Sequence, residues 1–171
     1  MKALVVYESM FGNTEAIARA VAAELQSALD VTVAEARDIP SAVGVDLLVV
    51  GAPTHAFGLS RPGTREDAVR QGSARPADLG IREYLDVSPM LNCTAAAFDT
   101  RVDKPRLPGS AAHRAHRRLR GLGCRLPITP ASFRVSGTRG PLLPGETDRA
   151  HEWARRLAAA VLMAKEASGR G

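Results

Sequence analysis

The stretch LVVYESMFGNTEAIARAVAAEL, residues 4–25, joins a strand pattern to a helix pattern through a short polar turn. The apolar run ends at Tyr7, and after the turn apolar residues recur with the period of about four that a helix requires. Between the two patterns lie Ser9, Gly12 and Asn13, which are residue types that suit tight turns. The stretch therefore predicts a strand, a turn and a helix in direct succession.

The same alternation continues along the rest of the chain. Strand-like runs occupy residues 2–7, 31–36, 46–52, 93–98 and 131–135. Helical patterns occupy residues 14–29, 110–122 and 146–167. The first, third and fourth strand-like runs are almost entirely apolar, as expected for strands that are covered on both faces. Strands and helices in alternation favour an α/β fold in which helices wrap a parallel sheet.

Length and composition set the scale of the fold. The chain has 171 residues, of which 45% are hydrophobic, so we expect a single globular domain over residues 1–171. One polar segment, SRPGTREDAVRQGSARP at residues 60–76, interrupts the alternation. We interpret it as an excursion within that domain, with one short helix capped by Thr64 and closed by Gly72.

The location of the protein is expected to be the cytoplasm. No apolar run approaches the roughly 18 residues that a membrane span needs. The N-terminus enters a strand pattern at once, without the segments of a secretory signal. Cys93 and Cys124 show no metal-binding spacing and no CxxC pair, so we expect buried thiols at the amino edge of the sheet, and no structural disulfide.

The chain is basic, with a formal net charge of +5 and a pI near 9.9. Basic residues gather before and within the helix predicted at residues 110–122, where they lie opposite its apolar stripe. They are Lys104, Arg106, Arg114, Arg117, Arg118 and Arg120. A solvated face is the simplest interpretation. An acidic partner, a carboxylate-bearing substrate or an anionic membrane surface would also suit this charge. Nucleic acid is not expected, because no reading helix, RNP aromatic pair or zinc module accompanies it.

The turn after the first strand can bind an anion. In an open parallel sheet, ligands bind outside the carboxyl ends of the strands, where the strand order reverses. A helix N-terminus offers unpaired N–H groups and a positive dipole. Ser9 and Thr14 add hydroxyls, Asn13 adds an amide, and Gly12 allows close approach of the backbone. The alternative is an ordinary capped connection. The GxGxxG and GxxxxGK[ST] patterns are absent, which disfavours dinucleotide binding and P-loop nucleotide hydrolysis.

The sequence VVYESMFGNTEAIA resembles the phosphate loop of flavodoxin-like proteins. This resemblance implies a three-layer α/β/α sandwich whose five parallel strands have the order 2-1-3-4-5. It also implies a bound FMN with its phosphate on the first loop, at Ser9, Met10, Phe11, Gly12, Asn13 and Thr14. Phe11 stands where many flavodoxins carry a second hydroxyl residue. This loop is similar to the aromatic-bearing loops of flavodoxin-like quinone reductases and of flavoproteins that work with a diiron centre.

The resemblance implies two further loops around the flavin ring. GAPTHAFGLS at residues 51–60 resembles the Gly-x-Pro-Thr loop of the family. It would place Pro53 and Thr54 beside the phosphate and ribityl chain, and His55, Ala56, Phe57 and Gly58 beside the ring. FDTRVDKP at residues 98–105 would supply Phe98, Asp99, Thr100 and Arg101.

Several roles in these loops stay open. The chain is too poor in aromatics for a sandwich of Trp and Tyr around the flavin, so Phe57 or His55 would have to stack on it. Core packing is the alternative for Phe57 and Phe98. His55 could also move a proton, but no neighbouring carboxylate orients it, and we assign no catalytic residue.

The function that the resemblance implies is electron transfer by an FMN-binding flavodoxin-like protein. One alternative is an FMN-dependent oxidoreductase acting on a small substrate of the quinone or protoporphyrinogen type, because TRVDKP is loosely similar to a loop of flavodoxin-like protoporphyrinogen oxidases. Another is a flavodoxin-fold binding protein that has lost its flavin. Familiar carrier flavodoxins are acidic, so the pI near 9.9 favours a redox partner protein or substrate of acidic character.

Overall fold

The computed structural model describes residues 1–76 and 78–168. Five strands form one sheet in which all neighbours run parallel, in the order β2-β1-β3-β4-β5. They are β1 (Lys2–Tyr7), β2 (Asp30–Glu35), β3 (Leu47–Pro53), β4 (Thr94–Val102) and β5 (Ala131–Val135). This sheet confirms the predicted fold class and strand order.

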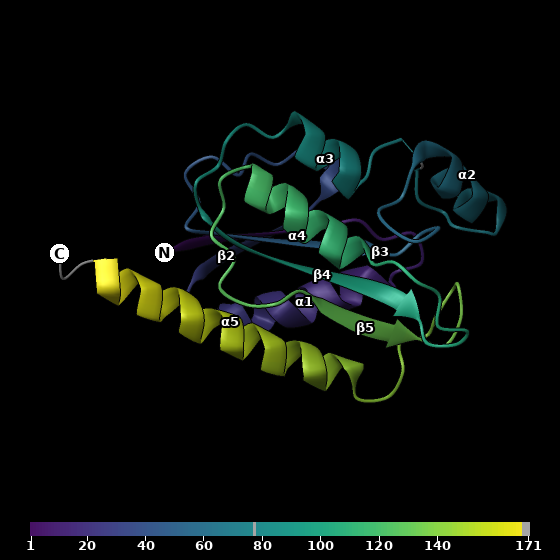
Figure 1. Cartoon of the computed structure of the whole chain (residues 1–171). Helices are drawn as coiled ribbons and strands as arrows, with labels where there is room; N and C mark the ends of the chain where they lie inside the picture. Colours follow the sequence, from purple (N-terminus) through teal and green to yellow (C-terminus); the bar gives the residue numbers. More distant parts are fainter. Residues whose placement is uncertain (77, 169–171) are drawn as a thin grey trace.

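Helices cover both faces of the sheet, which gives three layers (Figure 1). The helices α1 (Asn13–Leu25) and α5 (Glu146–Ser168) pack side by side on one face. The helices α3 (Ile81–Val87) and α4 (Ala111–Gly121) lie on the other, and α2 (Pro62–Arg70) lies near the carboxyl ends of the strands. A single 3-10 turn, η1 (Ala36–Asp38), follows β2. In the part of the chain that the structure describes, no helix is both long and apolar enough to cross a membrane.

The strand β4 is longer than the sequence pattern predicts. Its apolar run stops at Phe98, where we expected a loop, but the strand continues to Val102 because its polar end still pairs with β5, with Arg101 opposite Arg134. The placement of Asp99, Thr100 and Arg101 in a loop is therefore wrong. These residues lie on the sheet, at the end of a central strand.

The segment predicted as a polar excursion contains α2. Its helix begins at Pro62 and not after a Thr64 cap, so the predicted cap is wrong. Proline is favoured in the first turn of a helix because its missing N–H would have no partner there. Thr64 is the third helical residue, and its hydroxyl accepts a hydrogen bond of 2.9 Å from the backbone N–H of Arg61. Gly72, with φ of 100°, follows the last turn, as predicted.

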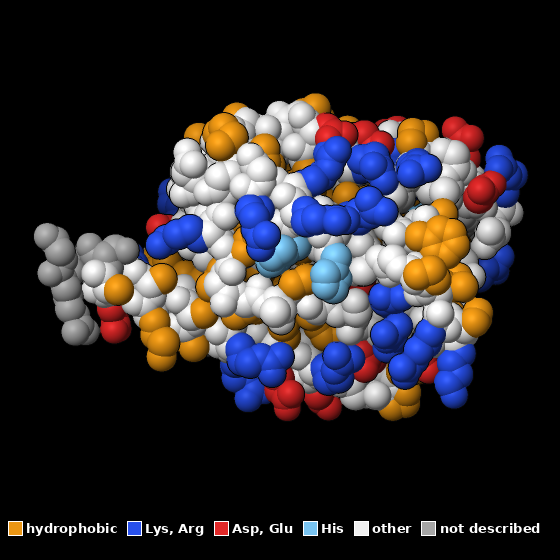
Figure 2. Space-filling view, viewed as in Figure 1, with side chains coloured by type: hydrophobic (Ala, Val, Ile, Leu, Met, Phe, Trp, Pro, Cys, Tyr) orange, Lys and Arg blue, Asp and Glu red, His pale blue; other side chains and the backbone are white. Residues whose placement is uncertain are grey.

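The helix α4 separates an apolar from a basic face, as its sequence predicts. Ala111, Ala112, Ala115 and Leu119 are buried against the sheet. Ser110 caps the helix, and its hydroxyl accepts a hydrogen bond of 3.2 Å from the backbone N–H of His113. Figure 2 shows Lys and Arg side chains gathered over the face that α3 and α4 form.

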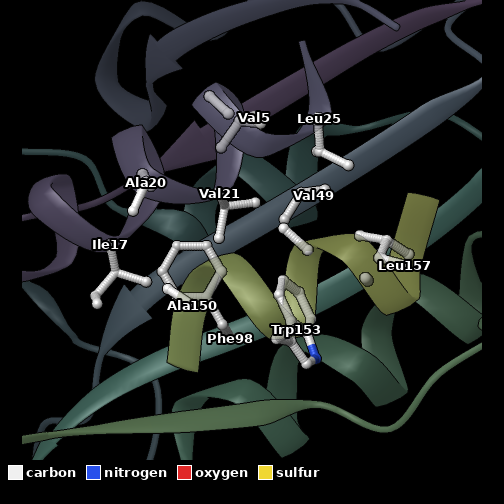
Figure 3. Close-up of a cluster of buried hydrophobic side chains, with 14 of the residues drawn as sticks. Val5, Ile17, Ala20, Val21, Leu25, Val49, Phe98, Ala150, Trp153 and Leu157 are labelled. Carbon is white, nitrogen blue, oxygen red and sulfur yellow. The ribbon is translucent and has the colours of Figure 1, made fainter. Parts of the chain in front are cut away.

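Two apolar cores flank the sheet. In the core beneath α1 and α5, the rings of Phe98, Phe133 and Trp153 meet edge to face, with centroids 6.0 to 6.5 Å apart. Figure 3 shows Phe98 and Trp153 in this core. Phe98 is fully buried there. Its ring covers Gly51 on the neighbouring strand so closely that a methyl group at that position would overlap with ring atoms. The core-packing alternative therefore describes the position of Phe98.

The two cysteines lie near one another at the amino edge of the sheet. Cys93 directly precedes β4, and Cys124 follows α4. Both are buried free thiols, as predicted, and their sulfur atoms are 3.7 Å apart. Contact with the other thiol and burial together raise the pKa of Cys93. The loops at the carboxyl edge lie at the opposite end of β4.

Candidate cofactor site

The loop after β1 leads directly into the N-terminus of α1. Gly12 occupies the cap position with φ of 90°, a left-handed conformation that glycine adopts without strain. Its N–H donates to the hydroxyl oxygen of Ser9 at 3.0 Å, so the hydroxyl hydrogen of Ser9 stays available to a ligand. The first N–H groups of the helix have no helical acceptor. The loop therefore gathers several hydrogen-bond donors at one position, which is also the positive end of the α1 helix dipole.

A pair of threonines connects this loop to β4. The hydroxyl oxygens of Thr14 and Thr100 are 2.7 Å apart, and both side chains are buried. Each hydroxyl can donate one hydrogen, and only one of the two is used in their mutual bond. The second hydrogen can therefore reach a ligand. Thr100 lies in the last part of β4, beyond residue 98, where the sequence pattern predicted that this strand ends.

The side chain of Asp99 holds the second loop and the start of α4 together. The hydroxyl of Thr54 donates to a carboxylate oxygen of Asp99 at 3.0 Å and accepts from the N–H of Ala111 at 3.0 Å. The same carboxylate oxygen accepts from the Ser110 hydroxyl at 2.5 Å and from the Ala112 N–H at 3.0 Å. A negative charge at a helix N-terminus stabilises it. Through these hydrogen bonds, Asp99 therefore fixes the position of the second loop relative to the start of α4.

The residues after Thr54 form a tight hairpin turn. The N–H and carbonyl groups of His55 and Gly58 bond to each other at 2.8 and 2.9 Å. Ala56 and Phe57 occupy its centre with φ of 39° and 74°, although neither is glycine. Such residues carry strain of order 1 kcal/mol or more and persist where packing holds them. Here Gly109 packs against the Phe57 carbonyl so closely that a methyl group would overlap with it.

His55 lies beside this turn as a neutral side chain. Burial, followed by the positive charge of Arg65, lowers the pKa of His55, and a hydrogen bond with the Thr64 backbone offsets part of that effect. The imidazole is therefore uncharged at neutral pH. It can pack against a flat ring or exchange hydrogen bonds without adding charge to the site.

These elements surround a pocket of about 330 Å³ at the carboxyl edge of the sheet. That volume lies at the lower end of the range for small-molecule sites, roughly 300 to 1,000 Å³. Eleven of the sequence-predicted residues line it: Ser9, Met10, Phe11, Asn13, Thr14, Pro53, Thr54, His55, Ala56, Thr100 and Arg101. The pocket lies beside β1 and β3, where the strand order reverses. This is the expected position for a ligand in a sheet of this type.

Five predicted residues do not line the pocket. Gly12 shapes the backbone, Asp99 lies behind the second loop, and Phe98 lies in the core. Phe57 and Gly58 line a neighbouring hollow on the other side of their turn. Phe57 is 52% exposed there, so core packing does not describe its position.

The helix α2 supplies a wall of the pocket that sequence analysis missed. Thr64, Asp67, Ala68 and Gln71 face it from that helix, and Val102, Val135 and Thr138 complete its lining. The helical spacing of the first four residues, within a segment already interpreted as a helix, is the signal that could have placed them on one face. The polar excursion therefore contributes to the site.

A buried charged network fixes the first loop to the excursion. Glu8 accepts hydrogen bonds from the hydroxyl of Ser60 and, at 2.9 Å, from the N–H of Ile81. Arg65 donates to Ser60 at 2.8 Å and pairs with Glu83 at 3.1 Å. Burial, only partly offset by these hydrogen bonds, raises the pKa of Glu8. The network holds the segments before and after α2 against the loop that opens α1.

The donor set of the pocket fits a phosphomonoester joined to a flat apolar ring. Hydroxyls, an amide and helix N–H groups cluster at Ser9, Asn13 and Thr14, and Met10, Phe11, Pro53 and Ala56 supply apolar surface. A methyl group added at Gly12 would meet no atom within 4 Å, so the space above the loop is open. These are the features that FMN requires of its site.

Comparison with known proteins agrees with this geometry. The family model of flavodoxin matches residues 5–75, which include the first loop and the second. A flavodoxin from the domain Archaea has 21% sequence identity and a TM-score of 0.65, over 94% of this chain and 99% of its own. Oxidised flavodoxin 1 from Bacillus cereus has 17% identity and a TM-score of 0.67, over 95% and 98% of the two chains.

A part of a larger protein also matches. The flavodiiron core of Flv1 from Synechocystis has 17% identity and a TM-score of 0.60, over 96% of this chain but 36% of its own length. The comparison with curated proteins gives no match. The sheet order and the similarity to these solved structures show a flavodoxin-like fold, and the family model of flavodoxin matches the part of the chain that carries both loops.

Proposed function

We propose that this protein binds FMN non-covalently at the carboxyl edge of the sheet and transfers electrons. The observation that carries the proposal is the convergence of two loops and the end of β4 on one pocket at the reversal of strand order. Ser9, Asn13 and Thr14 would hold the phosphate. Pro53, Thr54 and His55 would lie along the ribityl chain and the ring.

When bound, FMN supplies the redox chemistry, and the protein supplies position and electrostatics. The neutral His55 adds no positive charge beside the ring. Arg101, at the end of β4, is the cationic group that lines the pocket. Asp67, from α2, also lines the pocket and forms an ion pair with Arg70. The fixed positions of these groups would set the electrostatic field at the flavin.

A titration of the purified protein with FMN tests the proposal. We expect the flavin fluorescence to change to a one-to-one endpoint. The Thr14→Ala variant should bind FMN at least about 10-fold more weakly, because a hydrogen bond to a charged group contributes roughly 1.5 to 3 kcal/mol. Thr32→Ala, an exposed threonine in β2, is the matched control and should bind normally. If Thr14→Ala and Thr32→Ala bind FMN with equal affinity, the assignment of Thr14 to the phosphate is refuted.

A second candidate function is an FMN-dependent oxidoreductase that turns over a small substrate. It is supported by a concave basic surface directly beside the proposed flavin site, which a substrate with negative charges could use. Steady-state consumption of NAD(P)H or a quinone by the FMN-loaded protein would favour this candidate. Electron exchange that occurs only with a partner protein would favour the carrier.

We also propose that the protein works in the reducing cytoplasm, where its two neighbouring thiols would stay reduced.

A further inference from the structure

A second hollow adjoins the proposed flavin site. It has a volume of about 380 Å³ and shares Ala56 with the first pocket, so the turn at Ala56 and Phe57 separates the two. Its lining is dominated by five arginines: Arg61, Arg82, Arg114, Arg117 and Arg118. They come from the start of α2, from α3 and from α4. This cluster, named here the arginine pocket, lies within the basic face of Figure 2.

Backbone carbonyls hold one of these arginines in place. Arg82 donates to the carbonyl of Ser60 at 2.9 Å and to the carbonyl of Leu59 at 2.8 Å. Burial lowers the pKa of Arg82, and the positive charges of Arg61, Arg118 and Arg114 lower it further, more than Glu83 raises it. The guanidinium groups therefore act on each other as like charges.

Few acids compensate these charges. Arg118 forms an ion pair with Asp86. Within residues 1–76 and 78–168, the guanidinium groups of Arg61, Arg114 and Arg117 form no ion pair. Arg114 instead packs along Gly58, 3.4 Å from where a methyl group would lie. Like charges held together repel one another, and a bound anion would relieve that repulsion.

The shape of the arginine pocket favours a small ligand over a protein surface. It is concave, and its volume lies within the range of small-molecule sites. Guanidinium groups form paired hydrogen bonds with phosphate and carboxylate groups, for which their planar shape is suited. The shared wall at Ala56 would place a molecule held by these arginines next to the ring of a bound flavin.

We propose that the arginine pocket binds a small molecule with two or more phosphate or carboxylate groups, and that this molecule lies against the Ala56–Phe57 turn beside the proposed flavin site. The position beside the flavin rests on the proposed FMN function, whereas the anion binding does not. Arg82 provides the fixed end of the site, and Arg114 and Arg117, one turn apart on α4, provide its adaptable side.

Calorimetric titration of the FMN-saturated protein at constant ionic strength tests the anion site. The probes are inorganic pyrophosphate and citrate, and acetate serves as a monovalent control. We expect saturable one-to-one binding of pyrophosphate or citrate. Tighter binding of pyrophosphate indicates a natural ligand with phosphate groups, and tighter binding of citrate indicates one with carboxylate groups. Binding should weaken at least about 10-fold in the double variant Arg114→Gln and Arg117→Gln, which removes two charge-assisted contacts.

A matched double variant separates specific from general electrostatics. Arg120→Gln and Arg156→Gln remove the same charge from exposed positions on α4 and α5, outside the pocket. This variant should bind pyrophosphate and citrate like the unmodified protein. Equal weakening in both double variants would overturn the proposal, because net charge alone would then explain the binding. Binding of a polyglutamate peptide without saturable binding of either small anion would also overturn it, in favour of an acidic protein partner.

The link to the flavin has its own readout. Addition of the bound anion should shift the visible absorbance of bound FMN in the unmodified protein and in the Arg120 and Arg156 variant, but not in the Arg114 and Arg117 variant. Saturable anion binding without any shift would overturn the position of the site beside the flavin. Anion binding by a protein that never binds FMN would refute the proposed function and leave the anion site supported.

Discussion

Replacement of Asn13 by aspartate separates the stability of the fold from its affinity for a phosphate. Asn13 is the first residue of α1, and its side-chain N–H donates to the carbonyl of Arg139 at 3.1 Å. Aspartate has nearly the same shape, removes this donor and adds one negative charge. At a helix N-terminus that charge is favourable by about 0.3 to 1 kcal/mol. Loss of the hydrogen bond costs about 0.5 to 1.5 kcal/mol. The two effects nearly cancel, so the free energy of unfolding should change by less than about 1 kcal/mol.

The effect on FMN should be much larger. Two negative charges about 5 Å apart repel each other by about 3 kcal/mol at an effective dielectric constant of about 20. Since each 1.4 kcal/mol corresponds to about a factor of ten in affinity, this repulsion predicts roughly a 100-fold weaker complex. Salt should reduce the difference, because part of the repulsion is screened near the surface.

Fluorescence titration with FMN at low and high salt, together with urea denaturation, measures both quantities. Asn92→Asp is the matched control, because Asn92 is the other asparagine of the chain and is exposed near the amino edge of the sheet. We expect FMN affinity to fall for the variant at Asn13 and to stay unchanged for the control. Unchanged affinity at Asn13, with the fold intact, would refute the assignment of the phosphate to the start of α1.

Three further outcomes follow from the packing. Gly51→Ala should destabilise the protein by about 1 to 3 kcal/mol in urea denaturation, because the new methyl group overlaps with Phe98; an unchanged midpoint would contradict the packing described. Because burial raises the pKa of Glu8, the unfolded chain releases a proton that the folded protein keeps, and stability falls as pH rises from about 4.5 through the folded-state pKa. Glu8→Gln lacks this loss, so its stability relative to the unmodified protein should increase over that range, and a constant difference would be inconsistent with the raised pKa. Cys93 and Cys124, both 7% exposed, should react with a thiol reagent only in denaturant, and rapid reaction of the native protein would speak against their burial.

The first loop could be predicted from sequence because all its parts are local. Ser9, Gly12 and Thr14 lie within one strand-turn-helix stretch, and the helix positions them without help from distant residues. The second loop could be predicted for the same reason. The end of β4 could not, since Thr100 and Arg101 are polar and follow an apolar run. Pairing with β3, where Pro53 lies opposite Thr100, and with β5, where Arg101 lies opposite Arg134, keeps that segment extended.

Contacts between distant residues account for what sequence analysis missed. Glu8 and Ser60 are 52 positions apart, and no periodic pattern connects them. The basic residues of α4 were visible as a helical face. Arg61 and Arg82 join them only because the start of α2 and α3 lie beside α4 in the folded chain. The sequence of a single element therefore does not reveal an arginine cluster that three elements form together.

The most direct test of the account is the visible absorbance of the purified protein, followed by titration with FMN. We expect a yellow protein, or a colourless one that takes up FMN to a one-to-one endpoint and loses affinity when Thr14 is replaced by alanine. A colourless protein that leaves the fluorescence of FMN unchanged even at high concentration would contradict it.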